Sequence, residues 1–521
     1  MSIVLGLDSS TQGISAVILN TDEGRIVSEE TVRFGEDLPA FGQPSGFIPD
    51  GENGEVHADP LMWVEALNLL MERLKAQGCD LASVEAICGS GQQHGSVYLD
   101  EGFRAKLESL QAGQSLVAQI EPHLTRRTSP IWMDSSTSEE CAEIAAAVGG
   151  TEEVCRRSGS IAIERFTGPQ IRKFAKEDPE AWGRTGVVHL VSSFIASVMA
   201  GRSAGIDPGD GAGMNLMNLA DGAWDEGLVT ATAPGLMEKL PPLAKPGSVI
   251  GEIAGFFVER FGFSTGCKVV TFSGDNPCSL VGMGASSPGK VVVSLGTSDT
   301  LFAAMPEPRT DPNGYGHVFG NPMGGFMSLI CFKNGSLARE AVKEEFGLGW
   351  DAFEPGGLAE TPVGNEGRMM LPFFESEITP RVDTGGAKYA GWEGARDAAS
   401  SVRAVLEAQF TNMRLHFRWL GVEPEIILLT GGASQNDGIA QIVADVFGKP
   451  VSRLSVTGSA GLGAAMQAAA ACGVPLAALE EAFCRPEEGS TLVPSDGIRE
   501  TYDEFEQAFA EFLQGAQSAS N

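Results

Sequence analysis

Residues 8–13 form a polar turn between two apolar runs close to the start of the chain. A turn between strands presents several backbone N–H groups to one point, and such concavities bind phosphate oxygens. Ser10 and Thr11 would add hydroxyl donors, and Asp8 is suited to hold Mg²⁺ directly or through water, because this ion favours few carboxylates together with phosphate oxygens. An ordinary hairpin whose Asp and Ser residues cap the turn explains the same residues. Taken alone, this turn favours the plain hairpin over a phosphate site.

A second polar turn, residues 296–300, repeats this chemistry in the other half of the chain. Gly296 and Thr297 follow an apolar run and precede another one, as the first turn does. A plain polar turn is again the alternative. Two such turns far apart in one chain favour a phosphate held between two domains.

An acidic residue follows a third apolar run, in residues 273–277 (SGDNP). Phosphoryl transfer to an alcohol needs alignment, charge neutralisation and a base that accepts the hydroxyl proton. A carboxylate at the end of a strand suits the last task, and loss of such a base costs ~10²–10⁴-fold in rate. Asp275 is therefore a candidate base, although Asp beside Asn and Pro is also common in structural turns.

Two glycine-rich segments could contact a ligand. Residues 89–95 (GSGQQHG) gather the amide, imidazole and hydroxyl groups that make directional hydrogen bonds to a polyol, and His94 is explained equally well by a ligand contact or a structural role. In residues 430–436 (TGGASQN), small side chains let a ligand approach a helix N-terminus, which favours anions or polar rings. A Ser or Asn N-cap is the plain alternative there. The glycines of residues 458–463 lack the spacing of a dinucleotide fingerprint.

The composition restricts the class of protein. The 521 residues exceed the size at which single cores usually stop growing, so we expect two domains. The formal net charge of -32 would repel phosphate backbones and anionic membranes, which argues against nucleic-acid and membrane partners. The nine cysteines include no CxxC pair, and the N-terminus lacks the pattern of a signal peptide. We expect unpaired thiols in a cytoplasmic protein that works as a monomer or homodimer.

Hydrophobic patterns predict the elements that position these turns. Residues 3–7 and 14–19 are typical of the two strands of a hairpin around the first turn. Residues 290–295 and 300–304 repeat that arrangement around the second turn, which suggests a duplicated unit. Residues 60–77 carry apolar side chains near the helical period.

Strand–glycine turn–helix units towards the end of the chain indicate an α/β fold. A segment rich in Pro and Gly leads us to place the boundary between two domains at residue 254, giving domains 1–254 and 255–521. The acidic segment 480–511 shows no chemistry that we can assign, and we expect it to be a solvated helix or loop.

Taken together and in this order, the five segments resemble the FGGY carbohydrate kinases, over about residues 5–471. Three stretches are most similar to xylulose kinases of the animal type: GQQHGS at 91–96, WMDSST at 132–137 and ERFTG at 164–168. Further matches are SGDNP at 273–277, VSLGTSDTLF at 293–302, CFKNGS at 331–336 and TGGAS at 430–434. Their joint order is stronger evidence than any one of them.

The resemblance implies an α/β fold of two actin-like (ribonuclease H-like) ATPase domains, with ATP and sugar meeting in the cleft between them. Asp275 would deprotonate the terminal hydroxyl of the sugar for attack on the γ-phosphate, and Asp8 would belong to the Mg²⁺–phosphate site. The ketose would be held by His94, Gln93, Arg165, Asp275, Asn276 and Asp134. ATP would be held by Ser10, Thr11, Gly296, Thr297, Trp350, Gly431, Gly432, Ala433 and Asn436. The resemblance alone suggests Arg165 and Trp350, whose plain alternatives are a salt-bridge residue and a core aromatic.

The implied reaction is ATP + D-xylulose → ADP + D-xylulose 5-phosphate. Gln93 departs from many bacterial xylulose kinases, which carry Met there, and the sugar preference could shift with it. Ribulose and glycerol kinases share the phosphate machinery, so another pentulose or polyol is an alternative substrate. A non-catalytic actin-like nucleotide-binding module is a second alternative, but such a module has no need of Asp275 as a base.

Overall fold

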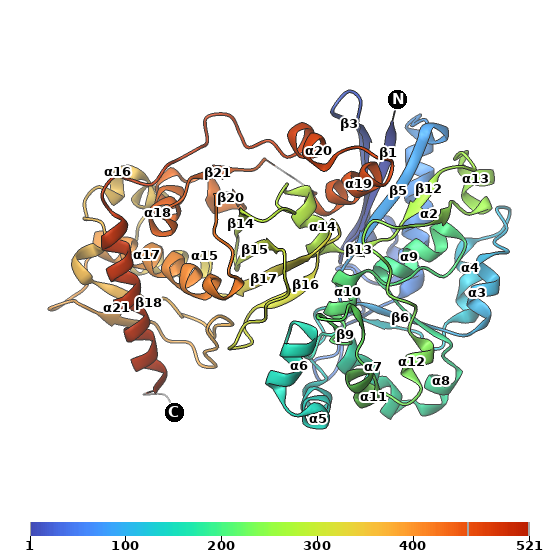
Figure 1. Cartoon of the computed structure of the whole chain (residues 1–521), viewed down its shortest axis with the longest axis horizontal. Helices are drawn as coiled ribbons and strands as arrows, with labels where there is room; N and C mark the ends of the chain where they lie inside the picture. The colour runs from blue at the N-terminus through green and yellow to red at the C-terminus, as the bar shows by residue number, and fades with distance from the viewer. Residues whose placement is uncertain (1, 456–457, 519–521) are drawn as a thin grey trace.

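Two mixed sheets form the centres of the two lobes in Figure 1. The computed structural model describes residues 2–455 and 458–518. The first sheet has the order β11-β12-β5-β1-β2-β3, with β13 beside β5, and the second has the order β16-β17-β15-β14-β20-β21. The strands of the first sheet are β1 Ile3–Ser9, β2 Gly13–Asn20, β3 Arg25–Arg33, β5 Val84–Gly91, β11 Val249–Glu252, β12 Lys268–Val270 and β13 Ser273–Gly274. Those of the second are β14 Lys290–Leu295, β15 Asp299–Met305, β16 His317–Gly320, β17 Phe326–Phe332, β20 Ile426–Thr430 and β21 Val451–Arg453.

The two sheets correspond strand by strand. In the first, β1, β2 and β3 form an antiparallel meander, and β5 lies parallel to β1. In the second, β14, β15 and β17 form the meander, and β20 lies parallel to β14. The predicted hairpins around residues 8–13 and 296–300 are confirmed, as is the α/β class. The matching orders also support the duplicated unit that the sequence suggested.

The first sheet extends beyond the predicted domain boundary at residue 254. Strands β12 and β13 pair in parallel with β5 and carry that sheet to Gly274. The second sheet begins at Lys290. By sheet membership, we propose that the chain passes from the first lobe to the second between residues 274 and 290.

Helices from both ends of the chain cover the first sheet. Helix α2 (Pro60–Ala76), predicted at residues 60–77, begins at the N-cap Asp59 and buries Trp63, Leu67, Leu70 and Leu74. Helix α19 (Ser459–Ala471) returns from near the C-terminus to pack on β1 and β5. The N-terminal lobe is therefore completed by a C-terminal helix, which sequence order alone does not reveal.

Helix α14 (Asp275–Gly282) crosses α19 at two glycines. A Cβ atom built on Gly463 would lie 1.9 Å from the carbonyl oxygen of Cys278, and one on Gly282 would lie 1.9 Å from that of Ser459. No other residue type fits this contact without displacing backbone. The crossing fixes the start of α14 relative to the end of β1.

A separate group of helices fills the lower part of the first lobe in Figure 1. Its core includes side chains of α5, α6, α7, α8, α11 and α12. These helices span Ser138–Val148, Thr151–Ser158, Thr167–Glu177, Pro179–Arg184, Glu226–Thr232 and Leu236–Lys239. Helix α10 (Pro208–Gly213) lies between this group and β16, and so joins the lobes.

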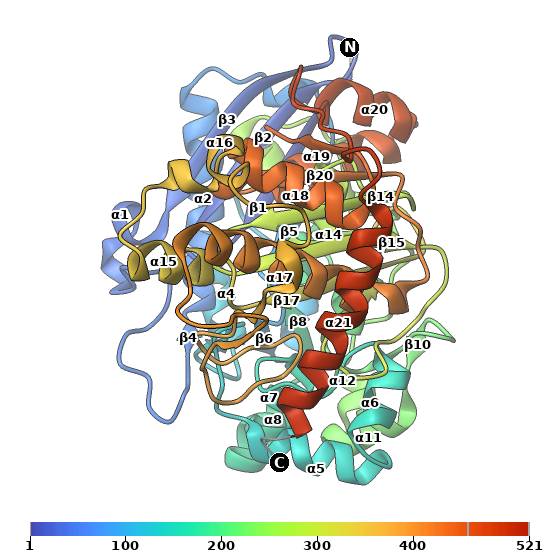
Figure 2. The same ribbon diagram turned by 90° about the vertical axis from the view of Figure 1, so that its left-hand side faces the viewer.

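The structure contradicts the prediction that the acidic C-terminal segment is simply solvated. Helix α21 (Arg499–Ser518) buries one face, with Tyr502, Phe505, Phe509 and Leu513 in the core of the second lobe. In Figure 2 it crosses the helices α17 (Ala398–Phe417) and α18 (Asp437–Phe447), which it contacts. The prediction failed because the acidic residues dominate the composition, while the apolar ones recur at the helical period and form a buried stripe.

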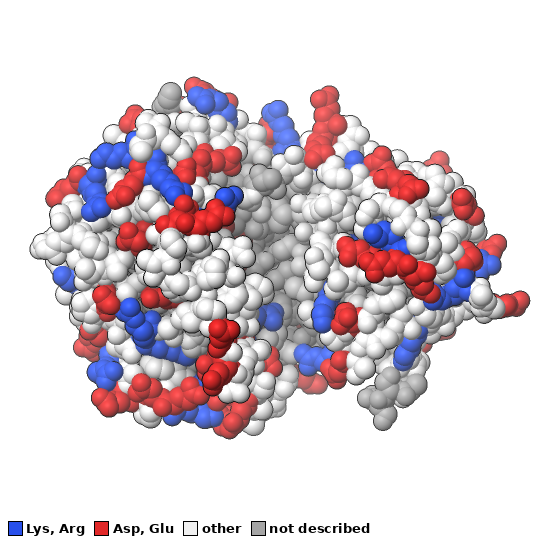
Figure 3. Space-filling model, turned by 180° about the vertical axis from the view of Figure 1, so that it is seen from behind, with Lys and Arg blue, Asp and Glu red and all other residues white. Residues whose placement is uncertain are grey.

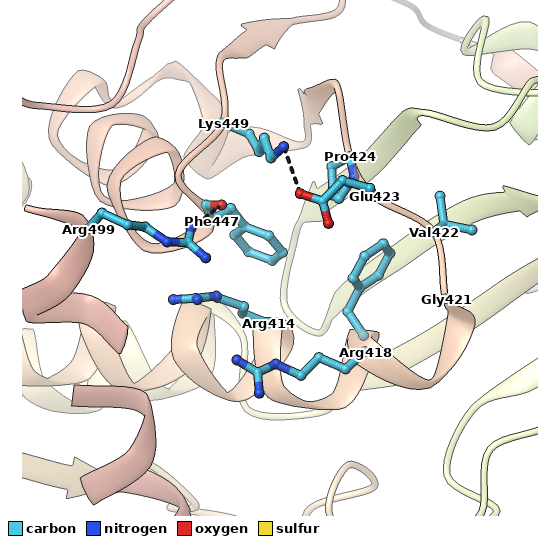
Figure 4. A pocket seen from close by; sticks show the side chains of 10 residues that line it. Arg414, Arg418, Gly421, Val422, Glu423, Pro424, Phe447, Lys449 and Arg499 are labelled. Carbon is cyan, nitrogen blue, oxygen red and sulfur yellow. Dashed lines mark hydrogen bonds and ion pairs between the residues drawn. The ribbon is translucent and has the colours of Figure 1, made fainter. Parts of the chain in front are cut away.

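Ion pairs join α21 to Arg414 and Arg418, which line the pocket of about 410 Å³ in Figure 4. Arg414 pairs with Asp503 and Glu506, and Arg418 also pairs with Glu506. Lys449 pairs with Glu423 at 2.8 Å. Because these basic groups already have carboxylate partners, the pocket is explained as a structural junction.

The surface carries its charged side chains mainly on the outer faces of the two lobes and is recessed between them (Figure 3). The nine cysteines are unpaired, as predicted. None of the helices in the described ranges is long and apolar enough to cross a bilayer.

The α14–α19 contact predicts a specific stability defect. Gly463→Ala should lower the free energy of unfolding by about 2–3 kcal/mol, because the new methyl group overlaps backbone that cannot move away. The comparison is made by denaturant unfolding with Gly515→Ala, the same change in α21 at a site with no heavy atom within 4 Å. That control should be neutral or gain about 0.5–1 kcal/mol from helix propensity. Equal stabilities for the two variants would contradict this account of the contact.

Candidate active site

The carboxyl ends of parallel strands bring the first site residues together. Strand pairing places Asp8 of β1 opposite Ser90 of β5, and Gly274 of β13 opposite Gly91. Asp275 follows directly as the first residue of α14. Ser90 Oγ donates to Asp8 Oδ1 at 2.7 Å. The sheet register therefore places two of the predicted carboxylates at one edge.

Asp275 is held through one of its two oxygens. Its Oδ1 accepts hydrogen bonds from the backbone N–H of Asn276 at 2.9 Å and of Gln93 at 3.3 Å. The side-chain amide of Asn276 also donates to Oδ1, at 3.2 Å. None of the described residues donates to Oδ2. The carboxylate is thus oriented with one oxygen left for a ligand hydroxyl.

Burial raises the pKa of both carboxyls. The pKa of Asp275 rises to about 7, mainly because the group is removed from water and secondly because of the charge of Asp8. Burial also raises the pKa of Asp8 to about 6, against the lowering effect of the Ser90 hydroxyl. A base is most efficient when its pKa lies near the operating pH, so Asp275 is better matched to proton abstraction than an ordinary Asp.

Two further buried carboxyls, Asp207 and Asp210, lie beside this pair and were missed in the sequence. Ser273 Oγ donates to Asp207 Oδ1 at 2.5 Å, and Ser192 Oγ donates to Asp210. Burial raises the pKa of Asp210 well above its ordinary value, and the charges of Asp207 and Asp275 raise it further. The Asp-Pro step at 207–208 indicates a helix start, and nothing in the sequence indicates its proximity to Asp275.

The predicted polar cluster lies against Asp275. Gln93 Oε1 accepts from Asn276 Nδ2 at 2.9 Å, while Gln93 Nε2 is buried and finds no partner among the described residues. His94 Nδ1 donates to the carbonyl of Gly213 at 2.8 Å, and its ring stacks on Phe166 with the centroids 4.3 Å apart. Burial lowers the pKa of His94, so its ring is neutral and Nε2 is an acceptor. The structure therefore brings Gln93, His94, Asp275 and Asn276 together, and their contact with a sugar stays a prediction.

The other two predicted sugar contacts differ in their surroundings. Arg165 is half-buried at the junction of the lobes, with its guanidinium 5.5 Å from the centroid of the Phe166 ring. Asp134 already accepts hydrogen bonds from Val56 N, Ser136 N, Ser136 Oγ and Gln170 Nε2. Burial alone would raise the pKa of Asp134, but hydrogen bonds from His57, Ser136 and Val56 outweigh it and lower the pKa. Asp134 therefore ties several loops together, and its contact with a sugar stays a prediction.

The first polar turn, residues 8–13, is ordered by hydrogen bonds of Ser10 and Thr11. Ser10 donates to the carbonyl of Gly13 through both its N–H, at 2.9 Å, and its Oγ, at 3.1 Å. Trp132 Nε1 donates to Thr11 Oγ1 at 2.8 Å. Thr11 Oγ1 keeps its own proton for a ligand, since a hydroxyl both accepts and donates.

The second polar turn, residues 296–300, contains one member of a buried ion pair, Asp299. Asp299 Oδ1 accepts from the N–H of Gly296 at 3.1 Å. Arg339 binds Asp299 through both terminal nitrogens, each at 2.9 Å, and neither side chain is more than 1% exposed. Thr297, at the tip of the turn, is exposed. A rigid support beneath an exposed tip suits a turn that binds a ligand through its backbone.

The second turn and the segment 431–436 lie side by side. Strands β14 and β20 are parallel, with Ser294 opposite Thr430. Gly431 has φ +87, and a Cβ there would lie 2.4 Å from the carbonyl oxygen of Leu295. A Cβ on the next residue, Gly432, would meet no heavy atom within 4 Å, and Ala433 is partly exposed. The structure therefore leaves an open backbone surface beside the turn.

The remaining two predicted ATP contacts have other roles in the described structure. Asn436 Oδ1 accepts from Ile439 N at 3.0 Å and caps α18. Trp350 is exposed on the second lobe, with Lys343 Nζ 5.0 Å from the centroid of its ring. Their contacts with adenosine stay predictions.

Comparison with known proteins identifies what this chain resembles. Residues 125–282 match the N-terminal domain of the FGGY family of carbohydrate kinases, and residues 291–472 match its C-terminal domain. The chain is 40% identical to xylulose kinase of Rattus norvegicus, covering 98% of this chain and 96% of that protein. It is 42% identical to xylulose kinase 2 of Arabidopsis thaliana, covering 90% and 87%.

Solved structures show the same fold at low identity. A xylulose kinase of Rhodospirillum rubrum matches with a TM-score of 0.81 at 20% identity, covering 99% of both chains. A glycerol kinase of Plasmodium falciparum with ADP matches with a TM-score of 0.75 at 16% identity, covering 98% of both chains. The two lobes are thus the two α/β domains of an actin-like sugar kinase fold, and that fold is shared by kinases of different acceptors.

The buried carboxyls predict how stability depends on pH. The pKa of Asp8 and of Asp207 is about 6 and that of Asp275 is about 7, so the folded state binds protons more tightly than the unfolded chain between about pH 4 and 7. The free energy of unfolding should therefore fall as pH rises through this window. Asp275→Asn removes one contribution, so its Tm should exceed that of wild type by about 2 °C or more at pH 8 and by less at pH 5. Thermal melts of both proteins without ligand, at pH 5, 6, 7 and 8, measure this, and parallel curves would contradict it.

Proposed function

The chain belongs to the FGGY family of carbohydrate kinases, and from this membership we propose that it transfers the γ-phosphate of ATP to D-xylulose, giving ADP and D-xylulose 5-phosphate. The relatives that are 40% and 42% identical over most of the chain are named as xylulose kinases, and they support this choice of sugar. The observation that carries the chemistry is Asp275, a carboxylate with a pKa of about 7 and one oxygen without a protein donor.

In the proposed reaction, Asp275 Oδ2 accepts the proton of the terminal hydroxyl of the ketose. The hydroxyl oxygen forms a bond to the γ-phosphorus of ATP while the bond to the β–γ bridging oxygen breaks, and ADP leaves. His94 Nε2 would accept a hydroxyl proton of the sugar, and Gln93 Nε2, buried without a partner, would donate to a sugar oxygen. These groups hold the acceptor in line and exclude water, which limits wasteful ATP hydrolysis.

ATP would lie between the two turns, with its phosphates at residues 10–11 and 296–297. The open backbone at Gly431, Gly432 and Ala433 would border the adenosine. Domain closure over both ligands would complete the site.

We propose that Mg²⁺ belongs to this site beside Asp8. Asp8 fits the ion because its carboxylate is a hard oxygen ligand. The charge of Asp8 also raises the pKa of Asp275, so a cation beside Asp8 would offset that charge. When bound, Mg²⁺ would neutralise charge on the phosphate oxygens. The nine unpaired cysteines further support our proposal that the enzyme works in the cytoplasm.

A kinase for another pentulose or polyol is the second candidate. The shared fold of the glycerol kinase neighbour shows that the architecture does not select the acceptor, and Gln93 lies directly against the candidate base.

The acceptor and the base are tested together. ADP release from Mg-ATP should be fastest with D-xylulose among D-xylulose, D-ribulose, L-ribulose and glycerol. Asp275→Ala should reduce kcat by ~10²–10⁴-fold, because the proton acceptor is lost. Asp221→Ala, which removes an exposed carboxylate, is the control and should keep wild-type rates. A preference for another acceptor keeps the kinase and rejects the sugar, while no acceptor-dependent turnover rejects the kinase.

The role of Asp8 is tested through the metal. Asp8→Asn should raise the Mg²⁺ concentration for half-maximal activity by about 10-fold or more, because one charge-assisted contact is lost. The KM for the ketose at saturating Mg²⁺ should change little. An unchanged Mg²⁺ requirement would remove Asp8 from the metal site.

A further inference from the structure

His317 of the second lobe contacts the sugar-site residue Arg165 of the first lobe. Arg165 Nη2 lies 3.4 Å from His317 Nε2. Burial lowers the pKa of Arg165, and no ion pair joins it to a carboxylate in the described part of the chain. A half-buried guanidinium that has no carboxylate partner depends on neutral acceptors for its orientation.

The chemistry of the pair fixes the tautomer of His317. Arginine has only donors, so His317 Nε2 accepts and its Nδ1 carries the proton. Nδ1 lies 3.1 Å from Ser160 Oγ, to which it donates. Burial and the charge of Arg165 lower the pKa of His317 to about 3, so the ring is neutral across the physiological range.

Ser160 and its neighbours hold the imidazole against the first lobe. The carbonyl of Ser160 accepts from Asn215 Nδ2 at 3.1 Å, and Ser158 Oγ donates to the same oxygen at 3.2 Å. Beside His317, the N–H of Val318 donates to the carbonyl of Gly159 at 3.0 Å. Strand β16 is therefore docked on residues 158–160 of the first lobe, next to Arg165.

The Phe166 ring completes this arrangement. It stacks on His94, carries Arg165 over its face and lies 5.5 Å from the ring of His317. His94, Phe166, Arg165 and His317 thus form one packed series from the polar cluster beside Asp275 to the second lobe.

We propose that His317 is a positioning residue for sugar binding: it holds Arg165 in the orientation that contacts the ketose, and so makes the ketose site depend on the junction of the lobes. The proposal rests on the proposed function, in which Arg165 contacts the acceptor. A hydrogen bond to a charged group is worth about 1.5–3 kcal/mol, which corresponds to roughly 10–100-fold in affinity.

The test compares two replacements of His317 by steady-state kinetics with the best acceptor of the panel above. His317→Leu should raise the KM for the ketose by ~10-fold or more and leave the KM for ATP within about 2-fold. His317→Gln should restore most of the ketose affinity, because its amide can accept from Arg165 and donate to Ser160. In the background of Arg165→Ala, His317→Leu should have little further effect on the ketose KM, because the two residues act as one unit.

His189→Leu is the matched control. His189 is another buried neutral imidazole with a pKa of about 3, and it also bridges two hydroxyls, Ser193 Oγ at 3.1 Å and Ser203 Oγ at 3.0 Å. Its loss should lower Tm without a selective change in ketose KM.

Each outcome decides between the proposals. The positioning role would be overturned if His317→Leu left the ketose KM unchanged, or if His317→Leu and His189→Leu raised it equally. Neither result would contradict the proposed kinase activity. Additive effects of Arg165→Ala and His317→Leu would show that His317 acts independently of Arg165, which also overturns it. A wild-type protein that turns over with no acceptor of the panel would overturn the proposed function as well.

Discussion

Helices α14 and α19 approach so closely that carbonyl oxygens of each helix occupy the space that side chains would take at Gly463 and Gly282. One of these helices begins with Asp275, and the other packs on β1, which carries Asp8 near its end. The contact therefore sets the spacing of Asp8 and Asp275, the two carboxylates to which the proposed function assigns the metal and the base. Any other residue at these positions would separate the helices and change that spacing.

Bringing Asp8, Asp207, Asp210 and Asp275 into one buried region costs free energy, because charged groups lose water and repel one another. Serine hydroxyls offset part of this cost. Ser90, Ser273 and Ser192 each donate to one of the carboxyls, while Asp275 keeps one oxygen without a protein donor. The result is an Asp275 whose pKa of about 7 suits the base of the proposed reaction. Functional sites commonly retain such unfavourable groups at the expense of stability.

The sequence predicted those parts of the site that lie in continuous segments. The two hairpins, Asp275 at the end of a strand and the polar group around His94 follow from local patterns of apolar runs and turns, and the resemblance added Arg165. The structure was needed wherever a contact joins distant segments. Asp207 and Asp210 have only the local signal of a helix start, and His317 lies in a strand with no distinctive pattern. Helix α21 was misjudged because its charge obscured an apolar stripe, and α19 joins the first lobe through a packing contact that no local pattern encodes.

The net charge of -32 sets a final constraint, because both ATP and the product are anions. A carboxylate under a phosphate turn would add repulsion, yet Asp299 lies directly beneath Gly296. Arg339 resolves this conflict: its bidentate contact neutralises Asp299, and Gln409 Oε1 accepts from the same guanidinium at 3.1 Å. Asp299 can then orient the N–H of Gly296 without presenting a net charge to the ligand. The enzyme thus keeps an acidic surface while the charges beneath this turn are paired locally, which is what the proposed phosphate site there requires.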